Sequence, residues 1–202
     1  MDARQYAPAT GRNREPIFEV LAQIIQPDSN ILEIASGTGE HAIFMASKLT
    51  SCCWIPSDVN SEAIESIAAW KKTCSLDNLK LPLLIDVAQP GWQQQLNGQE
   101  INAIVNINMI HISPWQSCLG LFKGAGEILP EGGILYLYGP YKRDGEHTAP
   151  SNASFDSSLR DRNPLWGVRD LEAVVAAAAA ENLTLQQVIP MPANNLSVIF
   201  SR

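Results

Sequence analysis

Residues 31–46, ILEIASGTGEHAIFMA, have the types and spacing needed to hold a nucleotide. Apolar and acidic residues alternate at 31–34, which predicts a buried strand, and apolar residues at helical spacing from Ala42 onward predict a helix. Between them, Gly37 and Gly39 let the backbone turn sharply and approach a ligand closely. The helix that follows offers free backbone N–H groups in its first turn. The pattern predicts strand, tight turn and helix, although an ordinary glycine-rich turn would share it.

An acidic residue stands at the distance from this turn that a ribose-binding site requires. Asp58 lies 19 residues after Gly39, at the end of a second predicted strand, 52–58 (CCWIPSD). Sites for dinucleotides and adenosyl groups place a carboxylate about 20 residues on, where it accepts hydrogen bonds from the ribose hydroxyls. The other interpretation is a solvated aspartate, because SDVN is a good turn sequence. The register after a strand favours ribose binding.

NAD and S-adenosyl-L-methionine share this arrangement, and two features favour the second cofactor. Glu33 stands just before the turn, where a carboxylate can meet the amino group of a methionine moiety but gives nothing to a pyrophosphate. The nicotinamide half of NAD commonly needs further strands or a substrate domain, whereas this chain ends with a predicted hairpin. The predicted cofactor is S-adenosyl-L-methionine, with an NAD-dependent oxidoreductase as the alternative.

Strands and helices alternate along the rest of the chain, which predicts an α/β fold with a Rossmann-like, doubly wound sheet. Further helices are predicted at 15–25, 61–74, 118–129 and 170–182, with a short helix or turn at 91–98. Further strands are predicted at 79–87, 101–109, 132–141, 183–191 and 196–202. The last two form a hairpin that adds an antiparallel C-terminal edge strand to a mostly parallel sheet. Pro16 is placed in a first helical turn and Ser61 at an N-cap.

Length and composition indicate a single domain, 1–202, with a substantial core, because 46% of the residues are hydrophobic. The net charge of -7 disfavours a nucleic-acid substrate, which needs a basic face. The N-terminus lacks an apolar signal core, and the longest aliphatic run, 173–180, is far shorter than the ~20 residues that span a bilayer. These features predict a cytoplasmic protein without a membrane segment. The four cysteines form no CxxC pair, so no metal is expected.

Several motifs together resemble those of a known enzyme class. LEIASGTGEH, WIPSD, IDV and GGILYLYGPY are similar to motifs of class I S-adenosylmethionine-dependent methyltransferases. More narrowly, GRNREPI, SGTGEHA, WIPSDVN, NINMIHISPW and SNASFDSSLRDRNPLWGVRD resemble the methyltransferase-like 26 family, a group of uncharacterised proteins. The resemblance covers nearly the whole chain. It implies the fold and the cofactor, and it leaves the methyl acceptor open.

The resemblance also implies roles for residues around the turn. The class pattern places Asp86, after the third strand, against the adenine ring, and it has glycine where this chain has Ala35. Alanine fits at this position if its φ is negative. Asn106, at the end of the fourth strand, is expected either to meet the cofactor or to satisfy backbone groups there. The predicted cofactor-binding residues are Glu33, Ala35, Ser36, Gly37, Gly39, Asp58, Asp86 and Asn106.

Residues for the methyl acceptor are expected after the fourth and fifth strands and in two polar segments, an N-terminal arm (1–15) and a lid or substrate segment (142–169). His111 is a candidate general base, with a structural hydrogen-bonding role as the alternative, and Tyr141 is expected on the same rim. The mixed charges of the two segments suit a small polar or anionic molecule. The substrate candidates are Arg12, Asn13, Arg14, Asn108, Asn152, Phe155, Asp156 and Arg162.

These observations predict an S-adenosylmethionine-dependent methyltransferase that acts on a small molecule. A non-catalytic protein that binds S-adenosylmethionine is a further alternative. The sequence identifies neither the acceptor atom nor the oligomeric state.

Overall fold

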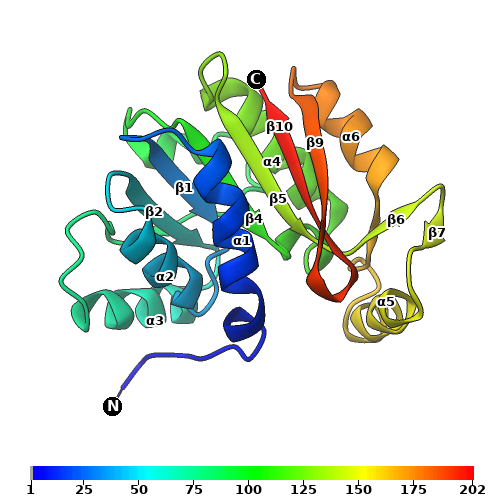
Figure 1. Cartoon of the computed structure of the whole chain (residues 1–202), viewed down its shortest axis with the longest axis horizontal. Coiled ribbons are helices and arrows are strands. Elements are labelled where there is room, and N and C mark those ends of the chain that lie inside the picture. Colours follow the sequence, from blue (N-terminus) through cyan, green and yellow to red (C-terminus); the bar gives the residue numbers. More distant parts are fainter. Residues whose placement is uncertain (1) are drawn as a thin grey trace.

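A seven-stranded sheet forms the centre of the computed structural model, which describes residues 2–202 (Figure 1). Its strands are β1 (Asn30–Ile34), β2 (Cys53–Asp58), β3 (Leu83–Leu84), β4 (Ala103–Ile107), β5 (Ile134–Gly139), β9 (Thr184–Met191) and β10 (Asn195–Ser201). Their order is β3-β2-β1-β4-β5-β10-β9. The first five run parallel, and β10 runs antiparallel to its neighbours β5 and β9. The predicted fold class, a mostly parallel sheet with an antiparallel C-terminal strand, is confirmed.

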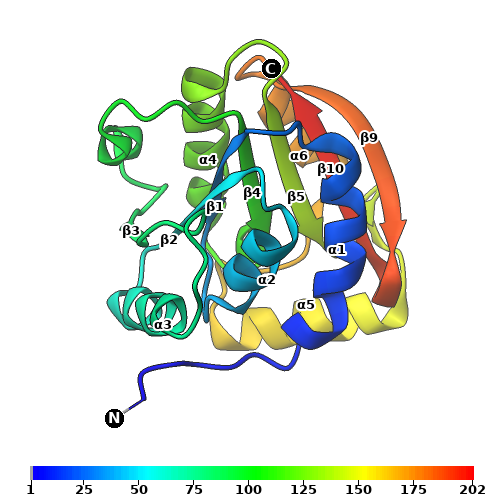
Figure 2. The same cartoon turned by 60° about the vertical axis from the view of Figure 1, so that its left-hand side comes forward.

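Helices cover both faces of the sheet, as Figure 2 shows from a second direction. On one face lie α1 (Thr10–Ile24), α2 (Glu40–Lys48) and α3 (Ser61–Lys72), and on the other lie α4 (Trp115–Ile128) and α6 (Leu171–Ala179). Successive side chains of a strand point to opposite faces. Ile31 therefore packs into the core beneath α1 and α2, whereas Leu32 packs into the core beneath α4 and α6. Within residues 2–202, no helix combines the length and the apolar character needed to cross a membrane.

The strand register brings the carboxyl ends of four neighbouring strands to one edge of the sheet. Ile34 pairs with Ser57 of β2 and with Asn106 of β4, and Ile107 of β4 pairs with Tyr138 of β5. In Figure 1 this edge faces the lower end of the molecule, where α1 begins. Ligands in open α/β sheets bind beyond the carboxyl ends of the strands. The register therefore determines which residues can form a site.

Two predicted helix starts differ from the structure. α1 begins at Thr10, so Pro16 lies inside the helix and not in its first turn. The helix tolerates the lost backbone donor because its neighbours Ile17, Val20 and Leu21 are buried against the sheet. The N-cap of α3 is Asn60 and not Ser61, since the Asn60 side chain accepts a hydrogen bond of 2.8 Å from the Glu62 N–H.

The segment 142–169, for which no helix or strand was predicted, has regular structure. It contains most of a small sheet of order β7-β6-β8, with β6 at Tyr141–Arg143, β7 at Glu146–His147 and β8 at Arg169–Asp170. A helix, α5 (Pro150–Arg162), joins β7 to β8. Its sequence lacks an apolar stripe, and two buried polar side chains, Asn152 and Asp156, fasten it instead. Such polar contacts leave no periodic signal in a sequence.

Glycines explain how α4 packs closely against the chain that follows β3. A Cβ atom at Gly120 would overlap the carbonyl oxygen of Val87, and one at Gly124 would overlap the indole of Trp92. The same indole N–H donates to the Gly120 carbonyl at 3.0 Å. The glycines therefore allow α4 to approach Val87 and Trp92 closely, although glycine has a low helix propensity.

We expect Gly124→Ala to lower the free energy of unfolding by about 1–3 kcal/mol, because the added methyl group overfills a packed contact. The matched control is Gly11→Ala in α1, where no described atom lies within 4 Å of the added Cβ. The control should be neutral or raise the free energy of unfolding by up to about 1 kcal/mol. Urea denaturation measures both, and equal effects at the two sites would contradict the packing argument.

Candidate functional site

The glycine turn between β1 and α2 is closed by backbone hydrogen bonds. The Ser36 N–H donates to the Ser57 carbonyl at 2.8 Å, and the Gly39 N–H donates to the Ser36 carbonyl at 3.0 Å. Gly37 and Gly39 have φ values of +55° and +90°, which favour glycine. At Gly39 a Cβ would press on Ile67, whereas at Gly37 no described atom lies within 4 Å of that position. Gly37 therefore leaves open space beside the turn.

Asp58 ties this turn to the end of β2. One carboxylate oxygen accepts the Gly37 N–H at 2.9 Å, and the other accepts the Asn60 N–H at 2.9 Å. Each carboxylate oxygen has a second lone pair, so Asp58 keeps acceptor capacity for a ligand. Asp86 lies at the same edge, since the Ile85 N–H donates to the Asp58 carbonyl at 2.9 Å. Two of the predicted cofactor carboxylates thus flank one end of the sheet.

Ala35 has φ +59°, so the condition under which alanine fits easily, a negative φ, is not met. The left-handed conformation brings the alanine Cβ close to its own carbonyl and costs about 1–2 kcal/mol. The turn imposes this conformation, because Ser36 must donate to Ser57 and Ser57 Oγ donates to the Glu33 carbonyl at 2.7 Å. Ala35 therefore carries backbone strain at the site.

Glu33 is buried under the turn. Its carboxylate accepts a hydrogen bond of 2.9 Å from the indole N–H of Trp54. Burial raises the pKa of Glu33 to about 7, although the hydrogen bonds from Trp54 and Ser36 act in the opposite direction. Glu33 therefore titrates near neutral pH, and a cationic group close to it would favour the ionised form.

Asn106 connects β4 to the glycine turn. Its side-chain N–H donates to the Ile34 carbonyl at 2.9 Å, which is the predicted backbone role. Its carbonyl oxygen is buried and has no partner among the described residues. An acceptor without a donor is costly in a protein interior, so this oxygen is available to a donor that enters the site.

Residues 2–9 cross the edge above the glycine turn. The Ala7 N–H donates to Glu40 at 2.6 Å, and the Gln5 N–H donates to the hydroxyl of Ser66 at 2.8 Å. That hydroxyl in turn donates to the Thr38 carbonyl of the turn at 2.8 Å. Glu40 and Ser66 were not predicted, because these contacts are to backbone groups that no motif marks. Met1, the first residue of the predicted arm, lies outside the described residues.

A cavity of about 590 Å³ lies beyond the ends of β4 and β5. It is bounded by the start of α1, the start of α5 and the turn between β9 and β10, which lie together at the lower end of Figure 1. Five predicted substrate residues line it: Arg12, Asn13, Asn108, Asn152 and Phe155. The remaining lining residues were not predicted and are Ala9, Tyr138, Pro140, Ser151, Pro192, Ala193, Asn194 and Asn195. The turn between β9 and β10 was not predicted as part of the cavity, because it lies there only as a result of the order of the strands in the sheet.

Three other substrate candidates lie outside this lining. The guanidinium of Arg14 stacks 4.9 Å from the ring centre of Phe44, and that of Arg162 stacks 5.1 Å from the ring centre of Trp166. Asp156 accepts the Val168 N–H at 2.7 Å. Three basic side chains of the small sheet and α5 also lie against the Asp156 carboxylate, namely Lys142 at 3.6 Å, His147 at 3.4 Å and Arg160 at 3.2 Å. These contacts give Asp156 a structural task in the segment 142–169.

His111 and Tyr141 were expected on an accessible rim, and the structure buries both side chains fully. Their rings meet edge to face, with centres 5.1 Å apart. Burial, followed by the charge of Arg169, lowers the pKa of His111 to about 3. A Cβ at Gly139 would overlap the imidazole, so the histidine sits directly beneath the backbone of β5. The geometry supports the structural alternative for His111 and gives Tyr141 no contact with the cavity.

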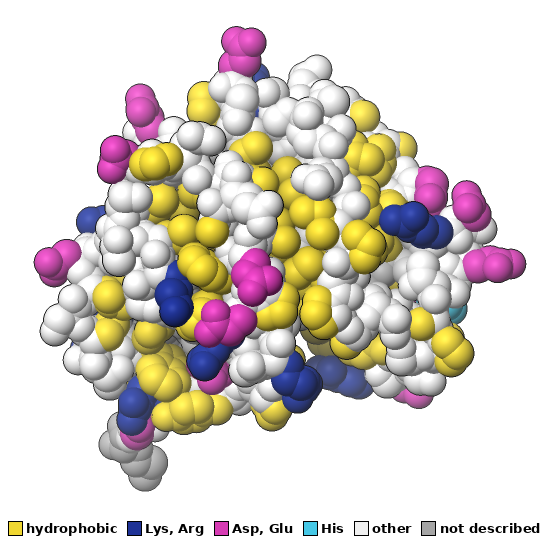
Figure 3. Space-filling view, in the orientation of Figure 1, with side chains coloured by type: hydrophobic (Ala, Val, Ile, Leu, Met, Phe, Trp, Pro, Cys, Tyr) yellow, Lys and Arg dark blue, Asp and Glu magenta, His cyan; other side chains and the backbone are white. Residues whose placement is uncertain are grey.

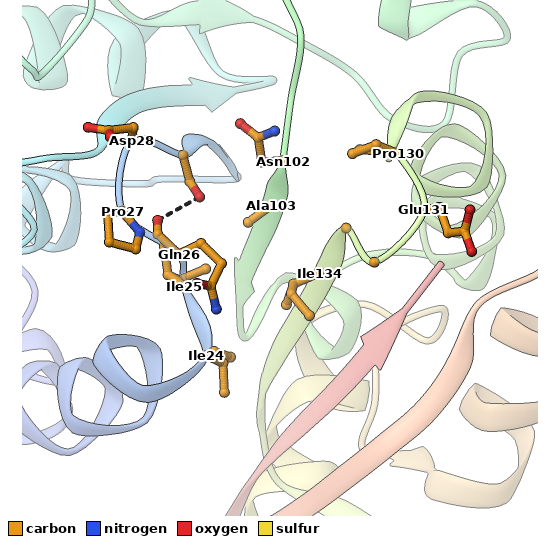
Figure 4. A pocket seen from close by; sticks show the side chains of 13 residues that line it. Ile24, Ile25, Gln26, Pro27, Asp28, Asn102, Ala103, Pro130, Glu131 and Ile134 are labelled. Atoms are coloured by element: carbon orange, nitrogen blue, oxygen red, sulfur yellow. Dashed lines mark hydrogen bonds between the residues drawn. The ribbon is translucent and has the colours of Figure 1, made fainter.

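A second cavity, of about 340 Å³, lies at the opposite edge of the sheet (Figure 4). It is lined by the amino ends of β1, β4 and β5, with Asn102, Ala103 and Ile134 among its residues. The loop on one side is closed by a hydrogen bond of 2.7 Å from Ser29 to the Gln26 carbonyl. Ligands in this architecture bind beyond the carboxyl ends of the strands. The candidate site is therefore at the carboxyl edge and not in this second cavity.

Metal-binding side chains do not gather at either edge. Among residues 2–202, no group of three or more His, Cys, Asp or Glu side chains is placed to hold a metal ion. The candidate site thus consists of the glycine turn with its carboxylates and the cavity beyond β4 and β5. Neighbouring strands are about 4.8 Å apart, so the two parts are separated by roughly 10 Å along the edge.

Comparison with known families gives one match along almost the whole chain. A family model described as "Protein of unknown function (DUF938)" matches residues 4–202.

Solved structures of similar fold include proteins described as methyltransferases. An O-methyltransferase family 2 protein from Planctomyces limnophilus, in complex with apigenin, has 19% identity and a TM-score of 0.73. An O-methyltransferase family protein from Burkholderia thailandensis has 11% identity and a TM-score of 0.78. Human N-acetylserotonin methyltransferase, in complex with SAM, has 11% identity and a TM-score of 0.76.

In these three comparisons 94%, 96% and 96% of this chain is covered, but only 61%, 57% and 52% of the other chains. At these identities the likeness shows the fold. The chain thus spans between about half and three fifths of the length of these structures.

The strain at Ala35 gives a first test. We expect Ala35→Gly to raise the free energy of unfolding by about 0.5–1 kcal/mol, because glycine adopts positive φ without the steric cost that alanine pays. Ala68→Gly, in the middle of α3, is the control and should lower the free energy of unfolding by about 1 kcal/mol. Thermal and urea denaturation measure both. Destabilisation at both positions would contradict the assigned strain.

The titration of Glu33 gives a second test. Its pKa is about 7 in the folded protein and ordinarily 4.5, so between these values the folded chain holds a proton that the unfolded chain has lost. Stability from this group is therefore present below about pH 4.5 and is lost as the pH rises to about 7. The loss is about 3 kcal/mol.

Glu33→Gln removes the titration and serves as the reference. The free energy of unfolding of the wild type, measured relative to this variant by urea denaturation, should fall between pH 4.5 and 7. A difference that stays constant across this range would contradict the raised pKa.

Proposed function

The chain belongs to the DUF938 family, and from its site we propose that it is an S-adenosylmethionine-dependent methyltransferase acting on a small molecule. The observation that carries the proposal is the glycine turn held by Asp58, with a cavity of small-molecule size on the same edge of the sheet. The likeness to structures described as methyltransferases, one of them in complex with SAM, supports it. The motifs of residues 151–170 extend the proposal to a relationship with the methyltransferase-like 26 family.

The residues around the turn suit this cofactor. Gly37 leaves open space at the turn, and Asp58 keeps acceptor capacity for two ribose hydroxyls. Asp86 lies beside it for the adenine, and the buried Glu33 offers a negative charge for the amino group of the methionine moiety. Ser36, Gly39, Ala35 and Asn106 complete the proposed set through the backbone of the turn and the unpaired Asn106 oxygen. The cofactor would supply an activated methyl group.

The task of the chain is then to position the acceptor and exclude water. Arg12, Asn13, Asn108, Asn152 and Phe155 are the proposed substrate residues, because they converge on the cavity beyond β4 and β5. Residues 2–9 and α5 cover that edge of the sheet from its two sides. A cytoplasmic location belongs to the same proposal, since the four cysteines are all free thiols, which a reducing compartment maintains.

Asp58→Asn tests the cofactor assignment. The variant keeps the size of the side chain but removes the charge that strengthens hydrogen bonds from ribose hydroxyls. A hydrogen bond to a charged group contributes about 1.5–3 kcal/mol, so S-adenosylmethionine affinity should fall about 10- to 100-fold. Isothermal titration calorimetry measures this, with S-adenosylhomocysteine and NAD as further ligands.

Asp28→Asn, in the cavity of the opposite edge, is the control and should bind as the wild type does. Unchanged affinity in Asp58→Asn would refute the role of Asp58. Tight binding of NAD, without any response to S-adenosylmethionine, would refute the proposed function and favour an oxidoreductase.

A further inference from the structure

The cavity beyond β4 and β5 has an unusual charge balance for this acidic chain. Among its described lining residues Arg12 is the single charged side chain, and none is Asp or Glu. The chain as a whole has 21 Asp and Glu against 14 Lys and Arg. Arg12 forms none of the ion pairs found in residues 2–202. Figure 3 shows several Lys and Arg side chains at the lower edge of the molecule, the end where α1 begins. The cavity therefore offers an uncompensated positive charge.

Amide side chains supply most of the remaining polarity. Asn13, Asn108, Asn152, Asn194 and Asn195 all contribute to the lining. Asn108, held at φ +65° directly after β4, makes no side-chain hydrogen bond within the described structure. Amide N–H groups donate to an anion without adding charge. The Asn108 amide is free to do so, whereas those of Asn152, Asn194 and Asn195 already donate to protein oxygens. Tyr138, Phe155 and Pro140 provide apolar surface beside them.

No group in the described lining is suited to remove a proton near neutral pH. Tyr138 is the one ionisable side chain of the described lining besides Arg12, and burial raises the pKa of its phenol. His41 approaches from α2, but its Nε2 is engaged with the Asn13 carbonyl oxygen at 2.9 Å, and burial lowers its pKa to about 4. His111 lies buried beneath Gly139, and Asp156 is held by the Val168 N–H and by three basic side chains.

A methyl acceptor in this cavity must therefore already be deprotonated at its reacting atom when it binds. Phenols, like the tyrosine side chain, ionise near pH 10 and need a base at neutral pH. Carboxylic acids ionise near pH 4 and arrive already charged. Building on the proposed function, we propose that the acceptor is a small carboxylic acid with an apolar body, methylated on a carboxylate oxygen, whose charge Arg12 balances in the cavity.

The reaction balances without a proton. A carboxylate oxygen forms a bond to the methyl carbon, and the bond between that carbon and the sulfonium sulfur breaks, its electron pair staying on sulfur. The negative acceptor and the positive sulfonium become a neutral methyl ester and a neutral thioether. The loss of charge weakens the attraction to Arg12, which favours release of the ester.

Binding of matched probes tests the inference separately from turnover. The protein is saturated with S-adenosylhomocysteine and titrated with benzoate, phenylacetate and hexanoate and with their primary amides. Nuclear magnetic resonance follows the side-chain amide signals of the cavity asparagines. A charge-assisted contact predicts about tenfold tighter binding of each carboxylate than of its amide. Arg12→Gln should abolish that preference and leave S-adenosylhomocysteine affinity unchanged.

Arg14→Gln is the matched control, because Arg14 lies two residues away but stacks on Phe44 outside the cavity. It should keep the full preference for carboxylates. The inference is overturned if no carboxylate shifts the asparagine signals, if amides bind equally well, or if the preference persists in Arg12→Gln.

The bonding atom is tested with methyl-labelled S-adenosylmethionine and a filtered small-molecule extract of cells. A methyl ester releases labelled methanol in mild alkali, as we expect, whereas an alkali-stable product would overturn the carboxylate assignment. If S-adenosylhomocysteine does not bind, or no label leaves the cofactor, the proposed function itself is refuted.

Discussion

The hydrogen bond of 2.9 Å between the Asp58 carboxylate and the Gly37 N–H is the contact on which the site depends. It joins the end of β2 to the turn after β1. The position of the predicted ribose-binding carboxylate is therefore fixed relative to the open space at Gly37. The same turn holds Ala35 at positive φ and buries Glu33 below it. Because a charge-assisted hydrogen bond is strong in a partly desolvated position, the strain at Ala35 can persist.

Polar groups are concentrated at one edge of an otherwise apolar sheet. Glu33, Asn106 and His111 are all buried near the carboxyl ends of β1 and β4, and the latter two each have a polar atom without a partner among the described residues. Such groups lower stability, so proteins retain them where a ligand or a local constraint requires them. The amino edge shows the contrast, since its cavity is open but its nearby polar groups pair locally, as Ser29 does with Gln26.

The small sheet and α5 form one unit around Asp156. That carboxylate contacts the Val168 N–H and three basic side chains from β6, β7 and α5, and these contacts replace the apolar stripe that a helix normally uses. The unit presents Ser151, Asn152 and Phe155 to the cavity while Arg160 and Arg162 face away from it. The result is a wall whose inner surface is neutral although its sequence is strongly charged.

The sequence by itself determined the fold class, most element positions and the glycine turn with Asp58, because these depend on periodicity and spacing within short stretches. It also indicated Arg12, Asn13, Asn108, Asn152 and Phe155, since polar segments near strand ends collect at one edge of such a sheet. Only the tertiary structure shows that Arg14, Asp156 and Arg162 lie outside the cavity lining and that the β9–β10 turn belongs to it. It also shows that His111 and Tyr141 are buried. Side-chain direction, burial and the choice of hydrogen-bond partner depend on residues distant in sequence, and no local pattern encodes them.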